Sequence, residues 1–78
     1  MIKVAFYAQL KDYFGEETEL ELPAGAVAAD IRSALAKRNA LAADWLKVSR
    51  LASEDAFVGE SEVLSGSRYY LLPPSSGG

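Results

Sequence analysis

Residues 16–39 read EETELELPAGAVAADIRSALAKRN, and the spacing of their apolar positions changes at the single proline. Before the proline, Thr18, Leu20 and Leu22 alternate with glutamates, which is the period of a strand with one buried face and one acidic, solvated face. After it, residues 27–38 place apolar side chains every three to four positions, as an amphipathic helix does. This change of period within one short segment predicts an α+β domain in which a helix packs on a sheet.

The helix is predicted over residues 27–38. Its start is weakly marked, because Gly25 is a poor N-cap, although Asp30 suits the positive end of the helix dipole. Its end is marked by two basic residues and by Asn39, which tolerates the left-handed conformation that often ends a helix. The apolar stripe of this helix consists of Val27, Ile31, Ala34 and Leu35.

Further elements are predicted on both sides of this segment. The β-branched and aromatic run at residues 2–9 predicts a strand that pairs with the glutamate-rich strand, and residues 68–72 predict a last strand. The remaining predicted pieces are helical turns at 11–14 and 41–46, and short strands at 48–53 and 56–58. The order is therefore β-β-α-β-(β)-β, with one main helix.

One helix covers only one face of a sheet, so the other face meets solvent or a partner. In the first strand, alternation turns Ile2, Val4 and Phe6 toward the helix and leaves Tyr7 outside. In the last strand, placing Arg68 outside also places Tyr70 and Leu72 outside, and Phe57 or a neighbour joins them. Adjoining exposed aromatic and aliphatic residues indicate an interaction surface. The alternative is that tyrosine is simply a good strand former with a solvated hydroxyl.

Composition narrows the possible functions. The 78 residues predict one domain, and they include no cysteine and no histidine, which removes a thiolate nucleophile and the commonest general base. A net charge of −3 argues against nucleic-acid binding, which needs clustered lysine and arginine. No run approaches the about 20 apolar residues of a membrane span, and the first residues lack the pattern of a signal peptide. A cytoplasmic location, with no nucleic-acid or membrane partner, is therefore expected.

The sequence ends in PPSSGG at residues 73–78. The two prolines favour an extended segment that projects away from the sheet, and two glycines can thread a narrow channel. Such a tail would deliver the carboxylate of Gly78 into the active site of another protein. Because a carboxylate is a poor electrophile, a partner would first have to activate it, for example as an acyl-adenylate. The competing interpretation is a frayed end or a cloning remnant.

The segments FYAQLKDYFG at residues 6–15 and YYLLPPSSGG at residues 69–78 resemble the small subunits of molybdopterin synthase. These belong to the MoaD/ThiS family of ubiquitin-like sulfur carriers, and the resemblance extends over essentially the whole chain. It implies a β-grasp domain at residues 1–72, with a mixed sheet of four to five strands and one main helix on one face. Residues 73–78 would then form an extended, flexible tail.

The resemblance also implies an activity. An E1-like enzyme would use ATP to adenylate Gly78, and a sulfurtransferase would convert the adenylate to a thiocarboxylate. The tail would then enter the large subunit of molybdopterin synthase, which supplies the catalytic residues, and would donate its sulfur to cyclic pyranopterin monophosphate to form the dithiolene. The chain itself would bind no metal and no cofactor beyond the transient adenylate and thiocarboxylate. The threading residues would be Pro73, Pro74, Ser75, Ser76 and Gly77, and the residues matching the family's docking patch are Tyr7, Phe57 and Leu72.

Two stretches depart from the family's usual sequences, SGSR at residues 65–68 and LASED at residues 51–55. Arg68 and Glu54 in these stretches either set the choice of partner through charge or are neutral surface. Three other functions stay open. They are a sulfur carrier for thiazole or another thio-metabolite, a ubiquitin-like modifier conjugated through Gly78, and a binding module whose Gly-Gly end is incidental.

Overall fold

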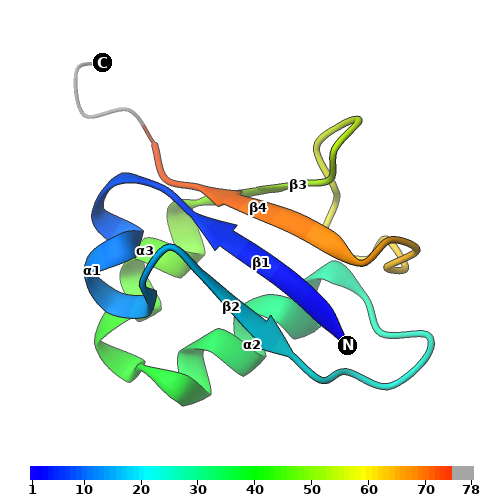
Figure 1. Ribbon diagram of the computed structural model, residues 1–78, viewed down its shortest axis with the longest axis horizontal. Helices are drawn as coiled ribbons and strands as arrows, with labels where there is room; N and C mark the ends of the chain where they lie inside the picture. Colours follow the sequence, from blue (N-terminus) through cyan, green and yellow to red (C-terminus); the bar gives the residue numbers. More distant parts are fainter. Residues whose placement is uncertain (75–78) are drawn as a thin grey trace.

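The first and last predicted strands lie side by side in the middle of one four-stranded sheet (Figure 1). The computed structural model describes residues 1–74, and the strand order is β2-β1-β4-β3. β1 pairs antiparallel with β2 and parallel with β4, and β4 pairs antiparallel with β3, so the sheet is mixed. The strands are β1 (Ile2–Phe6), β2 (Glu17–Leu20), β3 (Arg50–Ala52) and β4 (Arg68–Leu72), and the helices are α1 (Lys11–Phe14), α2 (Ala28–Arg38) and α3 (Ala43–Val48), with 3-10 turns at Ala8–Leu10 and Ala40–Ala42.

The hydrophobic core lies between the sheet and the helices, which gather on one side of it (Figure 1). Strand alternation explains its composition, because every second residue of each strand points toward the helices. The buried residues that the strands contribute are Val4, Phe6, Leu20, Leu51, Tyr69 and Leu71, and α2 contributes Ala28, Ile31 and Leu35. Phe6 also stacks on Phe14 of α1, with ring centroids 4.8 Å apart. The predicted inward set of β1 is thus confirmed, with Ile2 half-buried at its edge.

The boundaries of α2 agree with the predicted ones, but the interactions that begin and end the helix differ from those predicted. Val27 is the N-cap, and its backbone N–H donates to the Asp30 carboxylate at 2.8 Å. Gly25 lies before the helix in a turn with φ +85°. Asn39 follows the helix in extended conformation, not the left-handed one, because its side chain accepts from the Leu41 N–H and caps the next turn. Arg38 ties the helix end to β2 through the Thr18 hydroxyl and the Glu19 carbonyl.

Several predicted strands are shorter in the structure, and one is absent. The strand predicted at residues 48–53 is β3 at Arg50–Ala52, because Val48 is still part of α3. The run predicted as a strand at residues 56–58 is loop, and only Phe57 forms an isolated bridge, with Ala52. The predicted polar turn between the two runs is present, since the Ser53 hydroxyl accepts from the N–H groups of Asp55 and Ala56. Across it, the Ser53 and Val58 N–H groups donate to the Ala56 and Leu51 carbonyls, so the run lies beside β3, but the pairing ends there. The first strand ends at Phe6 instead of residue 9, because Ala8 has φ +52° and starts a 3-10 turn.

The turn before β4 is held by a buried hydroxyl. Tyr69 is 2 % exposed, and its hydroxyl accepts from the backbone N–H groups of Ser65 and Gly66 at 3.1 and 2.9 Å. A buried polar group needs such partners, so this tyrosine fixes the position of the turn relative to the core.

No helix within residues 1–74 combines the length and the apolar character needed to cross a bilayer.

We expect Ala8→Gly to stabilise the protein by about 1 kcal/mol, because a residue with a Cβ is strained at positive φ and glycine is not. Urea unfolding measures the change. The matched control is Ala34→Gly inside α2, where the same substitution should lower the free energy of unfolding by about 1 kcal/mol. If both variants were destabilised equally, the backbone at Ala8 would carry no strain.

Candidate docking site on the open sheet face

The sheet face opposite the helices presents outward-pointing residues from all four strands. The register aligns them in rows across the sheet, with Ala5 beside Tyr70 and Tyr70 beside Ala52, while Leu72 lies beside Arg50. Ala52 in turn bridges to Phe57 in the loop that follows β3. This face is therefore continuous from β1 to the loop after β3. The small side chains of Ala5 and Ala52 flank Tyr70, so the tyrosine ring projects above its neighbours.

Four residues of this face, two on β4 and two outside the strands, form what we call the aromatic patch: Tyr7, Phe57, Tyr70 and Leu72. The Tyr7 and Tyr70 rings lie with centroids 6.5 Å apart. Tyr7 is 42 % exposed and Phe57 53 % exposed, whereas Tyr70 and Leu72 are half-buried because β4 has a neighbouring strand on each side. Phe57 and Leu72 also line a shallow groove of about 410 Å³ together with residues 52–56. The four predicted interface residues are thus together on one face.

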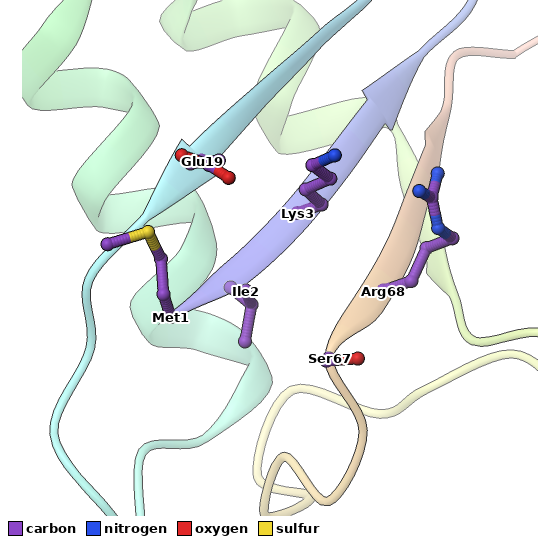
Figure 2. A pocket seen from close by; sticks show the side chains of 6 residues that line it. All are labelled: Met1, Ile2, Lys3, Glu19, Ser67 and Arg68. Carbon is purple, nitrogen blue, oxygen red and sulfur yellow. The ribbon is translucent and has the colours of Figure 1, made fainter.

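Charged residues border the patch along the sheet. At the starts of β1 and β4, Lys3 and Arg68 pair in register and both reach Glu17, at 3.5 and 3.4 Å. Figure 2 shows these two cations side by side in front of the sheet, with Glu19 on β2 beyond Lys3 and the helices behind. Arg50, near the other end, lies over Phe57, with its guanidinium carbon 3.8 Å from the ring centroid. Within residues 1–74, no three acidic side chains lie close enough together to hold a metal ion.

Two solved structures share this arrangement of strands and helices. The first is a putative molybdopterin converting factor, subunit 1, from Pyrococcus furiosus, with a TM-score of 0.80 and 24 % identity over 95 % of this chain and 97 % of that one. The second is SAMP1 from Haloferax volcanii, with a TM-score of 0.80 and 19 % identity over 99 % of this chain and 98 % of that one. The chain has the ubiquitin-like β-grasp fold. The predicted fold class is confirmed, and at these identities the likeness concerns the fold. The sequence matches no protein-family model and no curated protein.

In this β-grasp domain, the patch adjoins the place where the chain leaves the sheet. β1 and β4 are parallel, so Tyr7 follows the end of β1 at the same end of the sheet at which Leu72 closes β4 (Figure 1). Pro73 is half-buried and Pro74 is exposed. The predicted threading residues Ser75, Ser76 and Gly77, and the reactive Gly78, lie outside the described residues. Their roles, and the boundary between the domain and its tail at residue 72, stay predictions.

Sequence reasoning did not single out Arg50. The alternation that buries Leu51 also places Arg50 on the open face of the β-grasp sheet, so its exposure could have been inferred. Its contact with Phe57 could not, because that contact depends on how the loop after β3 folds back against the strand.

Proposed function

We propose that this chain is a sulfur carrier that acts as the small subunit of molybdopterin synthase, with Gly78 as the residue that carries sulfur. The observation that carries the proposal is the aromatic patch, which lies on the open face of a β-grasp sheet and adjoins the start of the PPSSGG segment. A partner bound to the patch would hold the base of that segment, so that the residues beyond it reach the partner's active site. The putative converting factor from Pyrococcus furiosus supports the same assignment by fold.

The chemistry of the proposal is divided among proteins. On an E1-like enzyme, a carboxylate oxygen of Gly78 attacks the α-phosphorus of ATP, and pyrophosphate leaves. A persulfide supplied by a sulfurtransferase then attacks the carbonyl carbon, and AMP leaves with the carboxylate oxygen. A thiol cleaves the acyl disulfide so formed, which releases the thiocarboxylate and leaves a disulfide. The thiocarboxylate gives its sulfur to cyclic pyranopterin monophosphate on the large subunit, and water restores the carboxylate of Gly78. This chain contributes the docking surface and the carboxylate, and its partners contribute the catalytic groups.

A second candidate function is a ubiquitin-like modifier, in which the activated Gly78 forms an amide with a lysine of another protein. SAMP1, a small archaeal modifier protein, covers nearly the whole chain and favours this candidate. The activation step is the same in both functions, and they differ in the nucleophile that follows. A carrier for thiazole or another thio-metabolite would use the same thiocarboxylate with a different acceptor.

We expect the protein purified from its native cells to contain a form that is heavier by the replacement of one oxygen with sulfur. Intact-mass spectrometry before and after alkylation of the thiocarboxylate measures it, and fragmentation places the change on Gly78. The same spectra test whether Gly78 is the last residue of the protein, as the proposal requires.

The alternatives give different masses. Heavier conjugates that fragment to a Gly78–lysine amide, without the sulfur-containing form, would replace the carrier by the modifier. If neither form occurred in cells that make molybdopterin, the proposed function would be wrong.

A further inference from the structure

Arg50 differs from the other arginines in what its guanidinium contacts. Arg32 binds Glu60 and the Leu46 carbonyl, Arg38 binds Thr18 and Glu19, and Arg68 binds Glu17. Among residues 1–74, Arg50 is the one arginine whose guanidinium makes neither a hydrogen bond nor an ion pair. Its contact is the face of Phe57, 3.8 Å from the ring centroid.

The contact with Phe57 leaves the hydrogen-bonding edge of Arg50 available. A guanidinium is planar, and its five N–H groups point outward in that plane. The guanidinium carbon lies over the ring of Phe57, and none of the five N–H groups has a hydrogen-bond partner within residues 1–74, so these donors are available at the border of the aromatic patch. Both residues are exposed, which makes the stacked pair accessible to another protein. The stack also holds the long side chain in one orientation, which lowers the entropy lost when a partner binds.

Arg50 lies next to the residue after which the tail begins. It pairs in register with Leu72, the last residue of β4, and Pro73 follows directly. A contact at Arg50 would therefore hold a partner at the point where the chain leaves the sheet. The two cations at the far end of the face are different, because Lys3 and Arg68 already share Glu17.

We propose that Arg50 is a partner-recognition residue, and that the protein docking on the aromatic patch brings an aspartate or glutamate carboxylate to its free edge. The proposal rests on the proposed function, since it takes the patch as the docking surface. A carboxylate matches the edge of a guanidinium with two parallel N–H···O bonds, which lysine does not reproduce. Arg50 is the cation of this face that no carboxylate within residues 1–74 neutralises, so charge complementarity calls for an acidic group on the partner.

Carbodiimide cross-linking of an Arg50→Lys variant in extracts of the native cells tests this directly. The reagent joins an amine to a carboxylate in contact with it. We expect mass spectrometry to find the amine at position 50 joined to one aspartate or glutamate of a protein that the unmodified chain also retains. Cross-links through Lys47, which lies on α3 away from the sheet face, show that the reagent has worked. If the amine joined only Asp55 or Glu54 of its own chain, or nothing, the proposal would be overturned.

Affinity measurements with the purified partner found in this way provide the second test. We expect Arg50→Gln to weaken binding about 10- to 100-fold, and Arg50→Glu to weaken it further. Changing the cross-linked carboxylate of the partner to arginine should restore binding of Arg50→Glu. The matched control, Lys47→Gln, removes an exposed positive charge on α3 and should leave the affinity unchanged. Urea unfolding of each variant separates lost recognition from lost stability.

The outcomes separate this proposal from the one on which it rests. If Arg50→Glu bound like the unmodified chain while a charge on the patch abolished binding, the role of Arg50 would be wrong and the patch would remain the docking surface. If no thiocarboxylate or conjugate formed at Gly78 in the native cells, the proposed function would fail whatever the Arg50 variants did.

Discussion

A chain in which Leu72 is replaced by aspartate should keep its fold but no longer bind the large subunit of molybdopterin synthase, the partner in the proposed function. Leu72 is half-buried on the open face, where it lies beside Arg50 and lines the groove that it shares with Phe57. A carboxylate there would have to be desolvated against the partner's apolar surface, so we expect the affinity for the large subunit to fall at least about 100-fold. Titration calorimetry with the large subunit measures the affinity. The cost to folding should be about 1 kcal/mol, since the residue is not in the core.

Two substitutions to aspartate serve as controls. Leu41 is 83 % exposed on the helical side of the domain, so Leu41→Asp should leave binding unchanged. Leu71 is adjacent in sequence but fully buried on the opposite face of β4, so Leu71→Asp should unfold the protein. Circular dichroism distinguishes these cases. If Leu72→Asp bound the large subunit with the affinity of the unmodified chain, the aromatic patch would not be the docking surface.

The main features of the fold could be predicted from periodicity. The alternation at residues 16–22 gave one edge strand and its buried face, and the three- to four-residue spacing after Pro23 gave α2. These signals are strong because burial of one face selects every second residue in a strand and one stripe in a helix. The same rule placed β4 at residues 68–72 and turned Tyr69 and Leu71 inward.

The errors arose where short-range hydrogen bonds override periodicity. Residues 56–58 have the composition of a strand and lie beside β3 across the Ser53 turn, yet the pairing ends after one bridge and two backbone hydrogen bonds. The positive φ of Ala8 could not be predicted from residue type, since alanine rarely adopts it. Asn39 was expected in the left-handed region but caps a following turn instead.

The candidate site was predictable in part for the same reasons. Alternation placed Tyr7, Tyr70 and Leu72 on the open face without any structure, because strand parity fixes both faces at once. Phe57 was matched through the family resemblance, and its position depends on a loop that the pattern did not define. The Arg50–Phe57 stack depends on that loop and was missed. The open face is thus fixed by strand parity near its centre and by loop conformation at its border.

Removing Gly78 should abolish formation of the thiocarboxylate while leaving docking intact. Leu72→Asp, in contrast, should abolish docking and leave the reactive carboxylate in place. The deletion leaves Gly77 as a terminal glycine, so the chemical group is unchanged, but the carboxylate moves back by about 3.3–3.6 Å along an extended chain. A displacement of about 1 Å from a reactive geometry can cost about 100-fold in rate, so adenylation by the E1-like enzyme should become undetectable. Release of pyrophosphate measures the adenylation, and intact mass measures the loaded sulfur.

Removing Ser76 instead keeps Gly-Gly at the end and shortens the tail by the same amount. If the distance from the docked patch to the active site matters, both deletions should fail equally, and both should still bind the large subunit with the affinity of the unmodified chain. If only the Gly78 deletion failed, the Gly-Gly pair itself would be what the E1-like enzyme recognises, and the length of the tail would be free to vary. If the Gly78 deletion were adenylated and loaded with sulfur like the unmodified chain, Gly78 would not be the reactive residue, and the proposed function would be wrong.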